Sequence, residues 1–168
     1  DGAIDDTAAD RLLALAGPHP LYLTELARDY LADRLRLPEL PEGAINIPVS
    51  LKQILASRTA GLPPEAITVA RLLAVGARAM RLTDVALVCA MSLDETADAA
   101  DALKRARLIE LDRDRMWIAH DLFRSALYNG MTEPRRAMLH RRLAEHLQAE
   151  RPDESAGELS IHYDRAGE

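Results

Sequence analysis

Apolar residues recur every three or four positions along most of this chain, which is the spacing of an amphipathic α-helix. Gly, Pro and capping residues interrupt the pattern and mark where the helices begin and end. The pattern predicts helices over residues 7–16, 20–35, 50–60, 63–76, 83–91, 92–107, 121–129, 134–148 and 154–166. The expected N-caps are Thr7, Ser50, Thr83, Ser92 and Asp121. Ser92 is followed three residues later by Glu95, which is the signature of a capping box.

A clear strand signal follows the helix that ends at Arg107. Two short apolar runs, 108–111 and 116–118, flank the polar residues 112–115, and this arrangement predicts a β-hairpin. From Pro63 onward the expected order is therefore three helices and then a hairpin, which is the order of a winged helix, a variant of helix-turn-helix. We expect a mainly α protein: a helical bundle, a winged-helix domain with one β-hairpin, and then further helices.

A proline-rich stretch divides the chain. Pro38, Pro41, Gly43 and Pro48 lie close together, and this composition suits neither helix nor strand. The sequence therefore predicts four parts: helices over 1–37, a linker over 38–49, a winged-helix domain over 50–131 and further helices over 132–168.

Composition narrows the class of protein. The chain has 168 residues and a net charge of −6, which argues against a surface that tracks nucleic acid over its whole extent. No apolar run reaches the ~20 residues of a membrane span. The single cysteine, Cys89, lies in an apolar run, so we expect a buried thiol in a reducing, cytoplasmic compartment. The chain begins without Met and stops just after a helical pattern, so we expect a segment of a longer protein.

The motifs of common enzymes and metal sites do not occur. There is no phosphate-binding Gly-rich run, and Lys52 and Lys104 both fall inside predicted helices, so we expect no ATP hydrolysis by this segment. No serine stands in a nucleophile elbow, and we assign no catalytic residue. His140 and His146 are six positions apart, which places them about 240° apart around a helix, so we expect no metal site.

His120 stands out by its position. It ends the second predicted strand and is followed at once by Asp121, the expected cap of the next helix. A histidine at such a junction can present a ring nitrogen to a phosphate or a carboxylate. It can equally tie its own hairpin to the following helix, and the residues alone leave both interpretations open.

Two further functions remain as alternatives. A winged helix often binds DNA, but the helix over 93–107 carries four carboxylates beside its cations, and these would repel the phosphate backbone. Its acidic residues are Asp94, Glu95, Asp98 and Asp101, against Lys104, Arg105 and Arg107. The densest basic cluster lies on and just after the later helix over 135–147. Either these residues form a solvated helix face, or the helix serves as a protein-interaction scaffold. This cluster consists of Arg135, Arg136, Arg141, Arg142 and Arg151.

Several stretches resemble one family in that family's own order. They are similar to segments of STAND-type signalling ATPases, in particular the large ATP-binding LuxR-family transcriptional regulators. The matching stretches are Gly17–Leu23, Ile47–Leu51 with Leu62–Glu65, Ile118–Tyr128, Arg136–Ala144 and Ile161–Gly167. Two positions depart from the family pattern: Pro18 replaces a motif glycine and Ile118 replaces a common Phe.

The resemblance implies a division of labour. Residues 1–37 would be the end of the ATPase's helical lid, 50–131 a winged-helix domain that regulates rather than contacts DNA, and 132–168 the start of a tetratricopeptide-like sensor. Such a module is not an enzyme and holds no cofactor alone; ATP or ADP would bind a nucleotide-binding core upstream, a sensor would follow downstream, and another domain would bind DNA.

The resemblance also implies site residues. Pro20 takes the position of the proline that packs on the adenine, and His120 that of the histidine that reaches the ADP phosphate. The supporting positions are Gly17, His19, Asp121 and Arg124.

Overall fold

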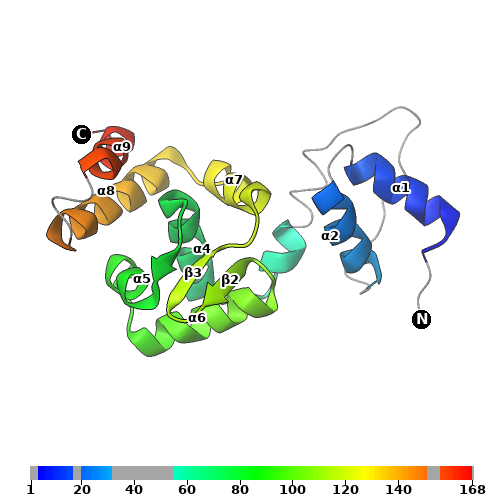
Figure 1. Ribbon diagram of the computed structural model, residues 1–168, viewed down its shortest axis with the longest axis horizontal. Helices are drawn as coiled ribbons and strands as arrows, with labels where there is room; N and C mark the ends of the chain where they lie inside the picture. The colour runs from blue at the N-terminus through cyan, green and yellow to red at the C-terminus, as the bar shows by residue number, and fades with distance from the viewer. Residues whose placement is uncertain (1–3, 17–19, 32–54, 151–155, 168) are drawn as a thin grey trace. The chain divides into compact units, whose positions relative to one another are not determined.

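The computed structural model describes residues 4–16, 20–31, 55–150 and 156–167 (Figure 1). Contacts divide the chain into two compact units, 1–60 and 61–168, and each is described by itself. The predicted linker over 38–49 and the expected cap Ser50 lie outside the described residues, whereas 55–59 are helical. Within the described residues, no helix is both long and apolar enough to cross a membrane.

The first unit contains a pair of packed helices. Helix α1 (Asp6–Ala16) and helix α2 (Pro20–Leu31) contact each other and bury Leu12 and Leu26. The predicted Thr7 cap is wrong: the Asp5 carboxylate accepts a hydrogen bond from the Ala8 N–H at 2.7 Å, and α1 therefore begins one residue before Thr7. Helix α2 begins at Pro20 as predicted, while its expected end near Leu35 lies beyond the described part.

The second unit has the element order of a winged helix. Helix α4 (Pro64–Gly76) is followed by strand β1 (Met80–Arg81), helices α5 (Leu82–Cys89) and α6 (Leu93–Arg105), and the hairpin of β2 (Ile109–Asp112) and β3 (Arg115–Ile118). Helices α7 (Asp121–Asn129), α8 (Glu133–Glu150) and α9 (Ala156–Ala166) come after it (Figure 1). The expected mainly α fold with a β-hairpin is confirmed.

Helix α4 is the centre of this unit. It contacts α5, α6, α7, α8 and β3. Its side chains are buried except at its first residues and at positions 67, 68 and 71 on one side. It begins after Pro63 with Pro64 at its first position, where a missing N–H costs nothing, as the sequence predicts. It ends at Gly76, and Ala77 adopts the left-handed conformation with a φ of 53°.

The hairpin belongs to a three-stranded antiparallel sheet in the order β1-β3-β2. Its turn is shorter than predicted, because Asp112 pairs with Arg115 and leaves a two-residue connection. The sequence pattern did not predict β1, whose two residues pair with the central strand: Met80 lies opposite Met116 and Arg81 opposite Arg115. A two-residue strand is too short for apolar alternation to show.

Strand β1 sets the start of α5. Pairing holds Arg81 in an extended conformation, and the helix begins at the next residue with Arg81 as its N-cap. The predicted Thr83 cap is therefore wrong. The capping box at the start of α6 is confirmed: Glu95 N–H donates to Ser92 Oγ at 3.2 Å, and Ser92 N–H donates to the Glu95 carboxylate at 2.8 Å.

Candidate functional site

His120 lies at the junction of β3 and α7. Its backbone is extended, with a φ of −144°, and it is the N-cap residue of α7. The predicted Asp121 cap is wrong, because Asp121 is already the first helical residue. The backbone carbonyl of His120 accepts the hydrogen bond from the Arg124 N–H at 3.1 Å, which closes the first turn.

The His120 ring is held by packing. Its centroid lies 5.8 Å from that of the buried Phe123 ring, at an interplanar angle of 49°. No described residue hydrogen-bonds the ring nitrogens, and the ring does not cap the helix. The side chain is half-buried, so a ring nitrogen can meet a partner that approaches this end of the hairpin.

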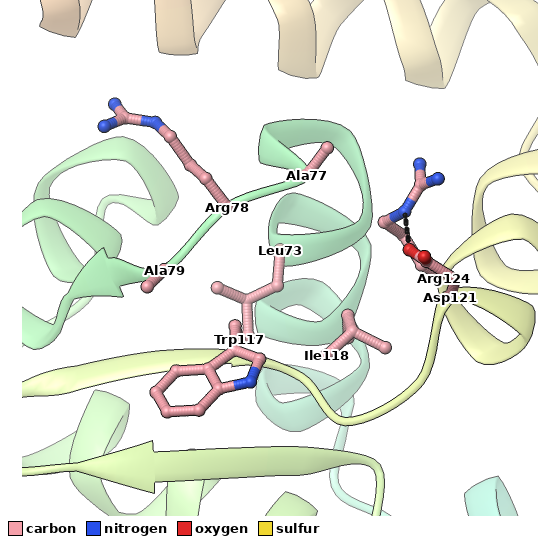
Figure 2. Close-up of a pocket in the computed structure, with 8 residues that line it drawn as sticks. All are labelled: Leu73, Ala77, Arg78, Ala79, Trp117, Ile118, Asp121 and Arg124. Atoms are coloured by element: carbon pink, nitrogen blue, oxygen red, sulfur yellow. Dashed lines mark hydrogen bonds and ion pairs between the residues drawn. The ribbon is translucent and has the colours of Figure 1, made fainter.

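A pocket of about 350 Å³ opens beside this junction. The last turn of α4, the connection to β1, the end of β3 and the first turn of α7 enclose it. Its lining residues are Leu73, Ala77, Arg78, Ala79, Trp117, Ile118, Asp121 and Arg124. In Figure 2, Arg78 and Arg124 lie on opposite sides of Leu73, and Trp117 lies below Leu73. The guanidinium group of Arg78 extends away from the other labelled side chains.

The pocket therefore combines an apolar floor with the Arg124 guanidinium group and the Asp121 carboxylate, and Arg78 lines its edge. Arg124 Nε lies 3.0 Å from Asp121 Oδ1, and both side chains reach solvent. A surface ion pair of this kind contributes about 0–1 kcal/mol, so Arg124 can exchange Asp121 for another anion at little cost. Arginine suits phosphate and carboxylate because its planar fork donates paired hydrogen bonds.

The structure brings together three of the six site residues that the sequence singled out. His120, Asp121 and Arg124 share the start of α7. Pro20 is the exposed first residue of α2, in the other unit. Gly17 and His19 lie outside the described residues.

Sequence reasoning missed Arg78 and Trp117. Trp117 carried a usable signal, because it alternates with the buried residues Met116 and Ile118 and so must point to the opposite face of the strand. Arg78 carried none, since its place depends on the unpredicted strand β1.

The helix in the recognition position of the winged helix has an acidic surface. Asp94, Glu95, Asp98 and Asp101 are all exposed on α6. The amine of Lys104 forms an ion pair with Glu110 of β2, which neutralises one of the nearby cations.

Two other kinds of candidate site in the described part of the chain are a metal site and a reactive cysteine. There, no group of three His, Cys, Asp or Glu side chains is placed to hold a metal ion. Cys89 is buried as expected, and burial raises the pKa of its thiol to about 11, partly opposed by Arg142.

Comparisons with family models, curated proteins and solved structures found no match for this chain.

Proposed function

We propose that this chain is a regulatory module of an ATP-dependent transcriptional regulator, in which a winged helix couples the nucleotide state to activation. The observation that carries the proposal is the His120 ring. It is oriented by Phe123, has no hydrogen-bond partner among the described residues, and stands at the end of β3 beside a pocket with two arginines. This is a suitable arrangement for contact with a phosphate group.

The module would act by binding rather than by chemistry. A ligand shifts a conformational equilibrium only through its different affinity for the two states. In the proposed closed state, His120 contacts the phosphate of ADP held by an upstream nucleotide-binding core of the same protein. In the open state this contact is lost, and the downstream sensor and a separate DNA-binding domain of this cytoplasmic protein become active.

The acidic surface of α6 supports regulation over DNA contact. Four exposed carboxylates would face the groove if α6 entered it, and binding to DNA depends on cations near the phosphates. A module that contacts another domain of its own protein needs no such basic helix.

The test uses the full-length parent protein. Replacing His120 with Ala removes a charge-assisted hydrogen bond to phosphate, which contributes about 1.5–3 kcal/mol, so we expect ADP to dissociate roughly 10-fold faster or more. Basal transcriptional activation should rise accordingly. His146→Ala is the matched control, because His146 lies on α8 beside Asp84 and outside the pocket at His120. Unchanged ADP retention in His120→Ala would refute the role of His120.

One observation favours DNA binding as a second candidate. The hairpin presents Arg113 and Arg115 at its exposed tip, where the wing of a winged helix can reach a phosphate backbone. A mobility-shift titration of the 168-residue chain at several salt concentrations decides between the two. A complex that weakens steeply with salt supports DNA binding, and no complex even at low salt excludes it.

A further inference from the structure

Three polar side chains form a hydrogen-bonded chain inside the second unit. The Tyr128 hydroxyl of α7 lies 3.0 Å from His140 Nε2, and His140 Nδ1 of α8 lies 2.7 Å from His162 Nδ1 of α9. His140 is 0% exposed and His162 is 4% exposed. The chain thus joins three consecutive helices through groups that can titrate.

The two histidines can share this contact only in some protonation states. When both rings are neutral, one Nδ1 carries a hydrogen and donates it to the other, and Tyr128 donates or accepts as the tautomer requires. A first proton leaves all hydrogen bonds possible but places a cation in the interior. A second proton puts an N–H on both facing nitrogens, so the contact between the rings breaks.

The surroundings oppose even the first proton. Burial, together with smaller electrostatic contributions from His162, Arg165 and Arg136, lowers the pKa of His140 from 6.5 to about 4. Arg136 lies over the Tyr128 ring at 5.4 Å.

Among the described side chains, no carboxylate contributes to the shift of the His140 pKa. Helices α4 and α5 also pack on α8 and carry the charged residues Glu65, Arg71 and Asp84, but none of these contributes to the shift. Asp84 instead lies 3.5 Å from His146 on another part of α8.

The contact between His140 and His162 lies between α8 and α9. The extensive contacts of α9 in the described structure are with α8 (Figure 1). His162 is its most deeply buried described side chain. A second polar link, from the Tyr163 hydroxyl to Gln148 Oε1 at 2.6 Å, lies at the surface. The buried histidine pair is therefore the part of the α8–α9 contact that a change of charge would disturb.

We propose that the chain Tyr128–His140–His162 is a proton-controlled latch, which holds α9 on α8 while the pair is neutral and releases α9 when it takes up a proton. The latch does not depend on the proposed nucleotide-linked function. It would make whatever follows α9 in the protein responsive to acid.

The direction in which pH changes the release of α9 follows from the lowered pKa of His140 in the docked state. In the released state His140 regains its ordinary pKa of 6.5, so protons favour release between pH 6.5 and pH 4. From this residue alone, the equilibrium constant for release should rise about 20-fold between pH 7 and pH 5. Above pH 7.5 it should be constant.

Hydrogen exchange of the 168-residue chain tests the latch. Protection factors for backbone amides in 156–167, corrected for the intrinsic pH dependence of exchange, should fall about 20-fold from pH 7 to pH 5. Protection in α4 should change much less. The control His146→Gln should leave the fall unchanged. Equal protection of 156–167 at both pH values, or loss of the fall in His146→Gln, would overturn the proposal.

Two further measurements test whether His140 is the group whose protonation releases α9. His140→Phe keeps an apolar ring in the interior and removes the proton acceptor, so α9 protection should no longer depend on pH. If the pH-dependent fall persists in that variant, the latch is excluded. Should that variant fail to dock α9, NMR titration of the His140 ring in the unmodified chain decides. A midpoint near 4 in the docked state supports the latch, and a midpoint near 6.5 refutes it.

Discussion

Replacing Leu143 with Ala tests whether α8 and the winged helix unfold together. Leu143 is 0% exposed on α8, and its Cδ2 lies within 3.6 Å of the position that a Cβ on Gly76 would occupy at the end of α4. Truncation of a fully buried leucine removes its packing and leaves a cavity, at a cost of about 3 kcal/mol in the free energy of unfolding. Because contacts place 61–168 in one unit, we expect this loss to affect the sheet as well as α8.

The assay uses the single tryptophan of the chain. Trp117 lies on β3 in the winged helix, so its fluorescence reports unfolding of that part and not of α8 alone. With an m-value of about 1.3 kcal/mol/M in urea for a unit of this size, the midpoint at Trp117 should fall by roughly 2 M.

The control is the same substitution at an exposed leucine. Leu87 on α5 is 65% exposed, so Leu87→Ala should change the free energy of unfolding by less than about 0.5 kcal/mol. The reasoning fails if Leu143→Ala lowers the midpoint of the helical circular dichroism while the Trp117 midpoint stays at the unmodified value. That result would show that α8 unfolds independently of the winged helix.

Three other predictions concern α5, its connection and α6. Ala90 ends α5 with a φ of 56°, so Ala90→Gly should stabilise the chain by about 0.5–1 kcal/mol in urea unfolding, whereas Ala97→Gly on the exposed face of α6 should destabilise it by a similar amount. Ser92→Ala removes the side-chain half of the capping box and should cost about 1 kcal/mol; NMR titration should show that the pKa of Glu95, lowered by hydrogen bonds to the Ser92 backbone N–H and hydroxyl, rises part of the way toward its usual value, because the backbone N–H remains. Cys89 should react with iodoacetamide at pH 8 far more slowly in the folded chain than in urea, because burial raises the pKa of its thiol; equal rates would contradict its burial.

Most of the fold of the second unit follows from local sequence signals. Helix α4 begins at its proline, α6 begins at its capping box, and the hairpin lies where two apolar runs flank a polar turn. These signals are strong because each depends on residues within a few positions of one another. The same reasoning placed the caps of α1, α5 and α7 wrongly. Asp5 accepts the capping hydrogen bond of α1, strand pairing makes Arg81 the cap of α5, and the extended His120 precedes α7. The neighbouring residues Thr7, Thr83 and Asp121 do not reveal this.

The candidate site was predictable only where it is local. His120, Asp121 and Arg124 lie within five residues, so a motif could single them out together. The pocket also needs Arg78 and Trp117, which come from elements far apart in the sequence. The pair of His140 and His162 was missed for the same reason: spacing along one helix compares His140 with His146, whereas its partner comes from the next helix.

Strand β1 also has a consequence for the order of folding. The hairpin of β2 and β3 closes through two residues, but Met80 must find Met116 across 36 positions (116 − 80) that include both α5 and α6. Because the entropy cost of closing a chain grows with its length, we expect the hairpin to form first and β1 to join it late. Arg78 lies two residues before β1, so one wall of the pocket takes its position only when the sheet is complete. A folding intermediate with an intact hairpin would therefore lack the pocket.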